Sequence, residues 1–394
     1  MSALKVALVV LNDVHAGGAH GYEATEIRKL FEHVGSKFDF VTYSPTALKA
    51  SRKSQFPEMK DKTYRNGLLT MLMLNFRHSL AGYKLLKTVG LRHGRFERSI
   101  IKESVSLVYF LSPNPLALDL VDTPMITTVW DLGHRDIPEF VEISGDRHYE
   151  EREFFYRQTI PKSFRVIVDT DRTAERMQAI YGALGNRIIV QGLGVEQPAV
   201  SDRIKSAGSQ FFLYPAQFWP HKRHVLLLKA FKIVCQQDRN SRLVLTGSDK
   251  GNLDYVRKVA NELGVLDRIE FRGFVSSPEL AELMMDAHCL VFPSQLGPSN
   301  MPPLEAASLG TPVLISNIHF DPLLKHSLIH TVSSQDPNDW AKEMLRLLSL
   351  PKTASAPMAV TNKKSHVTLV DALTEFASLR AEWSSLRTAR YKRK

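Results

Sequence analysis

The sequence predicts an α/β protein built from two successive parallel sheets, and three observations support this fold class. A chain of 394 residues is long enough for two domains, each with its own core. Short, continuously apolar segments alternate with helical patterns along most of the chain, as parallel sheets require. This alternation stops in a segment rich in Pro, Ser, Gly and charged residues and then starts again. We therefore expect an N-terminal domain over residues 1–196, a linker over 197–209 and a second domain over 210–366.

Continuous apolar runs mark the expected strands of the N-terminal domain. A helix is expected after the first strand, over Ala24–His33, and another over Thr170–Tyr181, where Thr170 can cap the first turn. The expected strands are Val6–Leu11, Phe38–Tyr43, Ser106–Leu111, Met125–Val129, Arg165–Asp169 and Arg187–Gln191.

The second domain repeats the alternation, which predicts a doubly wound parallel sheet. Its expected strands are Phe211–Pro215, Leu243–Thr246, Arg268–Phe271, Leu290–Pro293 and Val313–Ile315, and its expected helices are His224–Gln236, Asn252–Leu263 and Pro278–Asp286. Apolar residues at spacings of three or four then form one face of a long final helix, within residues 367–394. These residues are Val370, Leu373, Phe376, Leu379, Trp383 and Leu386.

Composition favours a cytoplasmic protein. Hydrophobic content is 44% and charged content 23%, which are ordinary values for a soluble globular chain. No apolar run approaches the roughly 20 residues that span a bilayer, and no cleavage-site pattern follows the first strand. Cys235 and Cys289 both fall inside expected regular elements, so the sequence suggests neither a disulfide framework nor a zinc site.

The net charge of +10 is concentrated in two regions. Residues 51–100 hold eleven Lys or Arg against three Asp or Glu, and residues 351–394 hold nine against three. No nucleic-acid-binding module accompanies these charges, so we do not expect a nucleic-acid partner. Basic and apolar residues side by side in 51–100 are typical of a helix at an anionic membrane surface. The alternative is a domain helix with a buried apolar side and solvated cations.

Residues 291–316 predict a strand, a loop, a short helix and a second strand. The helix opens at Pro302-Pro303, Gly310 ends it and Pro312 precedes the next strand. Backbone N–H groups at such a helix start suit an anion. Glu305, one turn into the helix, would face the bound molecule, and its carboxylate suits a ribose diol.

Three further loops follow expected strands, where parallel sheets bind their ligands. Gly17-Gly18 follows the first strand and permits a close approach to phosphate, although it also suits a simple tight turn. Asp131 and His134 follow Met125–Val129 and are polar candidates for chemistry, with capping of the next segment as the structural alternative for Asp131. Lys222 lies in the loop after Phe211–Pro215.

The 291–316 stretch resembles the donor-binding signature of family-4 glycosyltransferases, which are retaining enzymes with two facing Rossmann-like domains (the GT-B fold). Gly297 stands where the first of the two glutamates of that signature usually lies, and a variant of the family with Gly-Pro-Ser/Thr-Asn before the prolines is closer to this chain. The matching residues are Pro293, Ser294, Leu304, Glu305, Ala306, Gly310, Pro312 and Val313.

The resemblance assigns roles residue by residue. Lys222 matches the lysine that neutralises the donor diphosphate, whereas Gln217 stands where an arginine is usual, and Trp130 replaces a histidine of the block that faces the sugar and acceptor. The final helix would cross back onto the N-terminal domain. The implied catalytic residues are Asp131, His134 and Lys222, and the implied donor-binding residues are Gly17, Gly18, Gln217, Lys222, Gly247, Phe274, Val275, Ser299, Asn300, Met301, Pro302 and Glu305.

The resemblance implies a retaining transferase that moves a hexosyl or deoxyhexosyl group from a nucleotide-diphosphate sugar to a glycan or lipid-linked glycan in cell-surface polysaccharide assembly. We expect peripheral contact with the inner face of the plasma membrane. We expect no cofactor and no metal, because Lys222 with helix N-termini can carry the diphosphate charge. The alternatives are another GT-B enzyme, such as a nucleotide-sugar epimerase or a phosphorylase, and a non-catalytic binding protein, which Gln217 and Gly297 favour.

Overall fold

The chain forms two compact units. Unit 1 comprises Met1–Trp130, Glu150–Gly192 and Asn362–Lys394, and unit 2 comprises Asp131–Tyr149 and Leu193–Thr361. The computed structural model describes residues 4–12, 18–35, 37–46, 60–64, 80–88, 93–191, 211–297, 301–317, 326–350 and 365–391. The predicted linker, 197–209, lies outside these residues.

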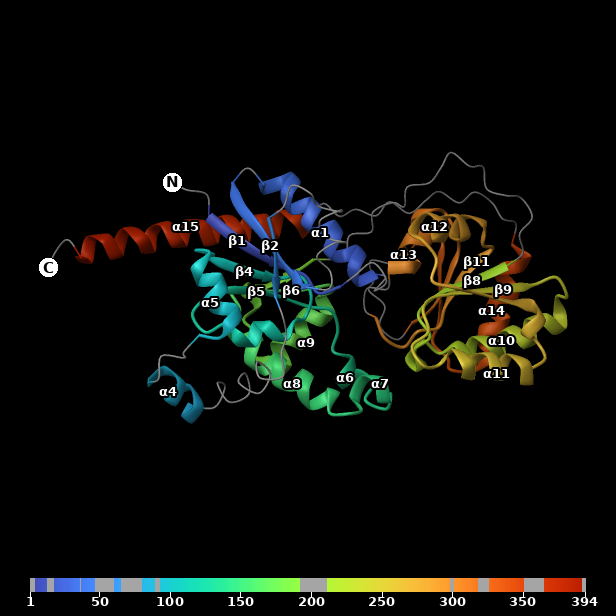
Figure 1. Ribbon diagram of the computed structural model, residues 1–394. Helices are drawn as coiled ribbons and strands as arrows, with labels where there is room; N and C mark the ends of the chain where they lie inside the picture. The colour runs from blue at the N-terminus through green and yellow to red at the C-terminus, as the bar shows by residue number, and fades with distance from the viewer. Residues whose placement is uncertain are drawn as a thin grey trace. The chain divides into compact units, whose positions relative to one another are not determined.

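Unit 1 contains a seven-stranded parallel sheet in the order β3-β2-β1-β4-β5-β6-β7 (Figure 1). The order runs outward in both directions from β1 and β4, which makes the gap between those two strands the topological switch point. The strands are β1 (Leu4–Val9), β2 (Phe38–Pro45), β3 (Lys60–Tyr64), β4 (Leu107–Phe110), β5 (Met125–Val129), β6 (Arg165–Val168) and β7 (Ile188–Val190).

Side chains of β1 alternate between two buried faces of this sheet, which explains why the strand is apolar throughout. Val6 and Leu8 pack in a cluster with residues of α1 and α15, whereas Ala7 and Val9 pack in a second cluster with Phe96 of α5. The helices of unit 1 are α1 (Gly18–Val34), α4 (Leu80–Thr88), α5 (Arg95–Lys102), α8 (His148–Thr159), α9 (Asp171–Tyr181) and α15 (Ser365–Tyr391). Residues 362–394 thus return to the N-terminal unit, and α15 packs beside α1.

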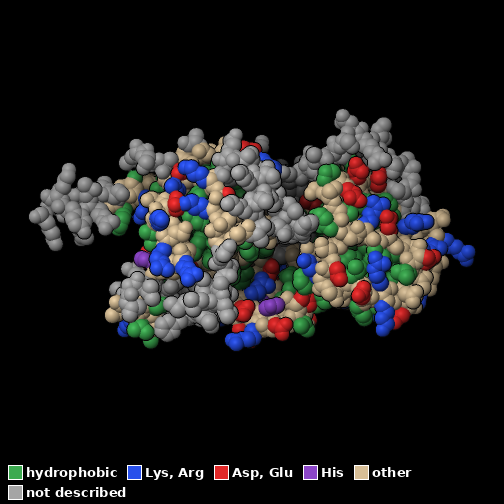
Figure 2. Space-filling view, viewed as in Figure 1, with side chains coloured by type: hydrophobic (Ala, Val, Ile, Leu, Met, Phe, Trp, Pro, Cys, Tyr) green, Lys and Arg blue, Asp and Glu red, His purple; other side chains and the backbone are tan. Residues whose placement is uncertain are grey.

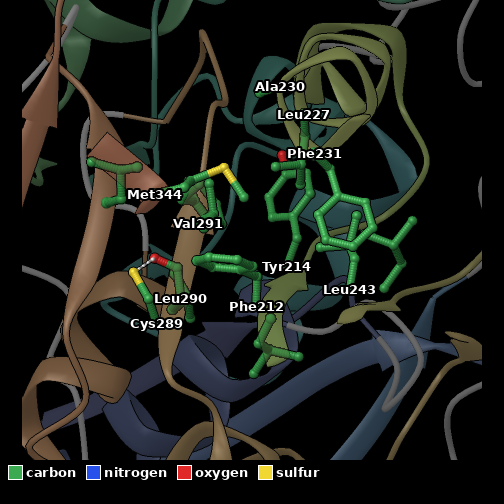
Figure 3. Packing of buried hydrophobic residues seen from close by; sticks show 14 of the residues in the cluster. Phe212, Tyr214, Leu227, Ala230, Phe231, Leu243, Cys289, Leu290, Val291 and Met344 are labelled. Carbon is green, nitrogen blue, oxygen red and sulfur yellow. Dashed lines mark hydrogen bonds between the residues drawn. The ribbon is translucent and has the colours of Figure 1, made fainter. Parts of the chain in front are cut away.

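Unit 2 contains a six-stranded parallel sheet in the order β10-β9-β8-β11-β12-β13, which repeats the arrangement of unit 1. Phe212, Tyr214 and Leu290 lie at the centre of its core, packed against Phe231 of α10 and Met344 of α14 (Figure 3). The strands are β8 (Phe211–Pro215), β9 (Arg242–Thr246), β10 (Ile269–Gly273), β11 (Cys289–Phe292), β12 (Val313–Ser316) and β13 (Ile329–Val332).

The helices of unit 2 cover both faces of this sheet, as a doubly wound fold requires. The two short helices α6 and α7 come from the segment Asp131–Tyr149, which interrupts unit 1 in the sequence and groups with unit 2 in space. The helices are α6 (Gly133–Asp136), α7 (Val141–Ser144), α10 (His224–Gln237), α11 (Leu253–Glu262), α12 (Ser277–Asp286), α13 (Met301–Ser308) and α14 (Pro337–Ser349).

Two findings bear on the composition-based expectations. Cys235 and Cys289 are free cysteines, and Cys289 is buried in β11. Among the described residues, no helix is both long enough and apolar enough to cross a bilayer.

Candidate active site

The loops after β8, β9 and β11 meet at the carboxyl ends of the unit 2 strands, beside the switch point between β8 and β11. Backbone hydrogen bonds join them: Phe218 N donates to Ser248 O at 3.1 Å, and Gln295 N donates to His221 O at 3.1 Å. Such an edge is where doubly wound sheets bind ligands. The fold therefore brings the sequence-predicted residues of these three loops to one place.

Lys222 is the most strongly perturbed cation of this edge. Its Nζ donates to Ser294 Oγ at 3.2 Å and to the Leu296 carbonyl oxygen at 3.5 Å, and lies 5.4 Å from the centre of the Phe292 ring. Burial lowers the pKa of Lys222 to about 8, and the negative charge of Asp131 only partly opposes this shift. Burial disfavours the charged form of Lys222, and an anion bound beside the ammonium group would stabilise that form.

Glu305 is a carboxylate that burial desolvates. It lies in α13, whose first turn carries Pro302 and Pro303, and burial raises its pKa to about 7. No described residue donates a hydrogen bond or forms an ion pair with the carboxylate, although such partners normally accompany a buried charge. A ligand hydroxyl pair at this position would supply the missing donors.

Gly297 follows β11, and α13, the helix that carries Glu305, begins four residues later at Met301. Gly297 has φ 119°, a conformation that side chains other than glycine rarely adopt, so the departure from the glutamate of the family signature is built into the backbone. Met301 opens α13 and Pro302 follows it. Ser299 and Asn300 lie outside the described residues.

Gln217 is held by its neighbour Trp219. The indole Nε1 of Trp219 donates to Gln217 Oε1 at 3.1 Å, and Lys250 Nζ lies 5.9 Å from the centre of the Trp219 ring. With its carbonyl oxygen occupied, the Gln217 amide presents its NH₂ group as a donor. Neither Trp219 nor Lys250 was predicted from the sequence, because no motif position marks them.

Gly247 is required by packing. Its φ is +136°, and a Cβ at this position would lie 2.3 Å from the carbonyl oxygen of Ala216 in the neighbouring loop. The next loop along the sheet follows β10, where Phe274 is 48% exposed and Val275 is half-buried. Both are among the donor-binding residues that the resemblance implies.

Asp131 and His134 lie in the segment that groups with unit 2. Asp131 Oδ1 accepts a hydrogen bond from Gly133 N at 2.7 Å, so the carboxylate does hold the start of the next segment, as the structural alternative expects. Burial lowers the pKa values of Lys222 and His221, and the charge of Asp131 partly opposes this lowering at both residues. His134 is fully buried and packs edge-on against Tyr149, with ring centres 5.4 Å apart.

The sequence analysis missed a buried pair in this site, Glu142 with His221. One oxygen of Glu142, Oε1, accepts from the backbone N of His221 at 2.9 Å and contacts its Nδ1 at 3.0 Å. Both side chains are about one-tenth exposed, at 10% and 9%. They are 79 residues apart in the chain, so no local pattern could have found them.

At the carboxyl edge of the unit 1 sheet, a buried glutamate holds the end of β1. The Glu23 carboxylate accepts from Leu11 N at 3.0 Å, from Asn12 N at 3.2 Å and from the hydroxyl of Ser112. Gly18 begins α1, and Gly17 lies outside the described residues.

Comparisons with known proteins agree with this geometry. Residues 199–364 match the family model described as "Glycosyl transferases group 1". The D-inositol 3-phosphate glycosyltransferase of Mycolicibacterium paratuberculosis is 27% identical over 218 residues, which cover 52% of this chain and 48% of that protein. The O-antigen chain mannosyltransferase of Salmonella typhimurium is 25% identical over 203 residues, 50% of each chain. The match thus spans about half the length of these curated relatives.

Solved structures extend the likeness to the whole fold. A glycosyltransferase from Rickettsia africae superposes with a TM-score of 0.65 at 14% identity, over 97% of this chain and 98% of that one. The Anabaena protein HepE, solved with UDP and glucose, superposes with a TM-score of 0.64 at 13% identity, over 97% of this chain and 100% of that one. Residues 199–364 are therefore similar to group 1 glycosyltransferases, and the chain as a whole has the two-domain GT-B fold.

Proposed function

We propose that this protein is a retaining glycosyltransferase that moves a hexosyl or deoxyhexosyl group from a nucleotide-diphosphate sugar to a hydroxyl acceptor. The observation that carries the proposal is the pair formed by Lys222 and Glu305. The first is a desolvated cation in the loop after β8, and the second is a carboxylate without a described partner in α13, the helix that follows β11. A nucleotide diphosphate offers the two groups that these residues lack, an anion and a ribose diol.

In the proposed reaction, Lys222 and the backbone N–H of Met301, the first residue of α13, balance the charge that grows on the leaving diphosphate; Pro302 and Pro303 carry no N–H. The bond between the sugar C1 and the diphosphate oxygen breaks while a bond from C1 to the acceptor oxygen forms on the same face. The acceptor proton passes to the departing phosphate. The protein supplies positioning and charge, with no protein nucleophile and no need for a metal ion.

The acceptor we propose is a glycan or lipid-linked glycan at the inner face of the plasma membrane. The relatives are named as an inositol 3-phosphate glycosyltransferase and an O-antigen chain mannosyltransferase, which supports a polyhydroxylated acceptor. The surface of α4 supports membrane contact, because it exposes Lys84 next to Leu85, whose side chain is 56% exposed. Cell-surface polysaccharide assembly is the process that combines these features.

One pair of observations favours a second candidate, a binding protein without turnover. Gln217 and Gly297 replace two charged residues of the family signature, and Gln217 is engaged by Trp219. A protein of this kind would bind nucleotide sugar and release it unchanged in the presence of any acceptor.

A thermal-shift screen over UDP-, GDP- and ADP-sugars tests the donor site first. A ligand at 100 times its Kd stabilises the fold by about 2.7 kcal/mol, a shift that such a screen detects. Lys222→Ala removes a charged hydrogen-bond donor that contributes roughly 1.5–3 kcal/mol, so calorimetry should show at least tenfold weaker binding of the selected nucleotide. Lys229→Ala, an exposed lysine on α10, is the matched control and should bind as the wild type does. Unchanged affinity in Lys222→Ala would contradict the donor-site assignment.

A further inference from the structure

The segment Asp131–Tyr149 has an unusual place in the chain. It leaves unit 1 at the end of β5, contributes α6 and α7 to unit 2, and rejoins unit 1 in α8. It also carries Asp131, whose charge acts on Lys222. The attachment of this segment to the rest of unit 2 therefore decides where that carboxylate lies.

Glu142, in α7, attaches this segment to His221, in the turn Pro220–Lys222 that ends at Lys222. Glu142 Oε1 accepts from the His221 backbone N–H at 2.9 Å, and the ring Nδ1 lies 3.0 Å from the same oxygen. Because that oxygen already acts as an acceptor, Nδ1 must be the protonated ring nitrogen, which leaves Nε2 without a proton in the neutral ring. Burial, followed by the charge of Lys222, lowers the pKa of His221 to about 4, so the ring is neutral at ordinary pH.

Apolar contacts surround this pair and add a second point of attachment. The ring of Phe140 meets the His221 ring edge-on, with centres 6.3 Å apart, and the Trp219 ring stacks with the His221 ring at 6.4 Å. Gly133 lies so close to Leu296 that a Cβ would be 2.8 Å from Leu296 Cδ2. The carbonyl oxygen of Leu296 accepts from Lys222 Nζ, so both attachments lead to the same lysine.

We infer that Glu142 is a positioning residue, which fixes the segment Asp131–Tyr149 on the turn that carries Lys222. The inference rests on the proposed function, and adds to it a residue that touches neither donor nor acceptor. Through this attachment, Glu142 fixes the position of the Asp131 carboxylate relative to Lys222, the cation that stabilises the leaving diphosphate, during turnover.

Hydrogen–deuterium exchange tests the attachment without reference to activity. In Glu142→Ala, peptides covering residues 131–149 should exchange at least tenfold faster, while peptides of the unit 2 core strands keep their wild-type rates. Glu142→Gln should exchange as the wild type does, because its amide oxygen can accept the same two hydrogen bonds. Glu151→Ala removes an exposed carboxylate from α8 with the same change of charge and serves as the matched control. Unchanged exchange in Glu142→Ala would overturn the inference even if the protein proves to be an active transferase.

Measurements of kcat and of nucleotide affinity then distinguish a positioning role of Glu142 from a role in donor binding. With the donor found by the nucleotide-sugar screen, Glu142→Ala should lower kcat at least tenfold and leave the Kd of the matching nucleoside diphosphate within twofold of the wild type, whereas Glu142→Gln should restore kcat. An equal loss in the Ala and Gln variants would mean that the charge acts directly, and a loss of nucleotide affinity would place Glu142 in the donor site. Either result overturns the positioning role. A wild-type protein that binds no nucleotide refutes the proposed function instead, while the exchange experiment still decides the attachment.

Discussion

At the scale of single residues, Glu305 is a group that the fold holds at a cost to its stability. Burial raises the pKa of Glu305 to about 7, so the folded state binds a proton that the unfolded state has released between pH 4.5 and 7. The stability that this group contributes is therefore present below pH 4.5 and is lost as the pH rises through 7. Such a cost, in a residue without a described partner, is typical of a ligand site.

We predict that Glu305→Gln is more stable than the wild type above pH 7, by about 3 kcal/mol, because about 1.4 kcal/mol accompanies each unit of pKa shift. The two proteins should differ little near pH 4.5. Urea denaturation at pH 4.5, 6 and 8 measures the difference. The same substitution should weaken nucleotide binding, since an amide accepts ribose hydroxyls less strongly than a carboxylate does. A pH-independent stability difference would show that Glu305 is not desolvated.

Gly297 provides a second prediction at this scale. Its φ of 119° disfavours any side chain, and a glutamate there would add the cost of partly burying a carboxylate. We expect Gly297→Glu to reduce turnover more than Gly297→Ala, which introduces the backbone strain without the charge. Initial rates with the screened donor measure both. If the wild type is inactive and Gly297→Glu creates activity, the protein is a lapsed enzyme, and the binding-protein candidate replaces the transferase.

The residues that sequence reasoning found are those with a fixed place in a continuous motif. Lys222 follows β8 by a short loop and Glu305 follows β11 by another, so strand patterns and punctuation located them. The role of Glu142 was not predicted because its partner His221 is 79 residues away in the chain. The role of Trp219 was not predicted because it depends on a contact with Gln217. Contacts between loops of different strands depend on the folded sheet, and a single sequence does not encode them locally.

At the scale of elements, the strands with continuous apolar runs were predicted well, whereas two of the four edge strands were missed. The expected bounds of β5 and β8 agree with the structure residue for residue. The edge strands β3, of sequence KDKTY, and β13, of sequence IHTV, were missed. An edge strand is covered less completely and carries polar residues that discourage pairing with other chains, so it lacks the apolar run that identifies a central strand.

Helix α15 illustrates how an element from the end of the chain completes a core. Phe376 is 5% exposed and packs edge-on against Phe164 with ring centres 5.2 Å apart, whereas Leu379, less than one turn further on, is 48% exposed. We predict that Phe376→Ala lowers the free energy of unfolding of unit 1 by about 3–5 kcal/mol, as for other buried aromatics. Leu379→Ala, the control, should change it by less than about 0.5 kcal/mol. Equal effects of the two changes, measured by urea denaturation, would mean that α15 does not pack on unit 1 in solution.

At the scale of the whole molecule, charge is distributed unevenly along the chain. The net charge of +10 comes from residues 51–100 and 351–394, and the chain outside these two ranges is net negative. The visible face of unit 2 mixes cations and anions (Figure 2). Both basic ranges contribute described residues to unit 1, in α4 and α5 and in α15, so the positive charge belongs mainly to the N-terminal unit.

This asymmetry predicts that the protein binds anionic vesicles through unit 1 and that salt releases it. Each cation near such a surface contributes about 1 kcal/mol, so replacing four of them with serine should lower the partition coefficient at least tenfold at low salt. The four are Lys84, Lys87, Arg92 and Arg95, and the matched control replaces Lys229, Lys232, Lys258 and Lys342 of unit 2 with serine. Sedimentation with vesicles of phosphatidylserine and phosphatidylcholine measures both. A wild-type protein that stays in the supernatant at low salt would contradict membrane contact, and equal losses in the two quadruple variants would assign binding to net charge rather than to the basic region of unit 1.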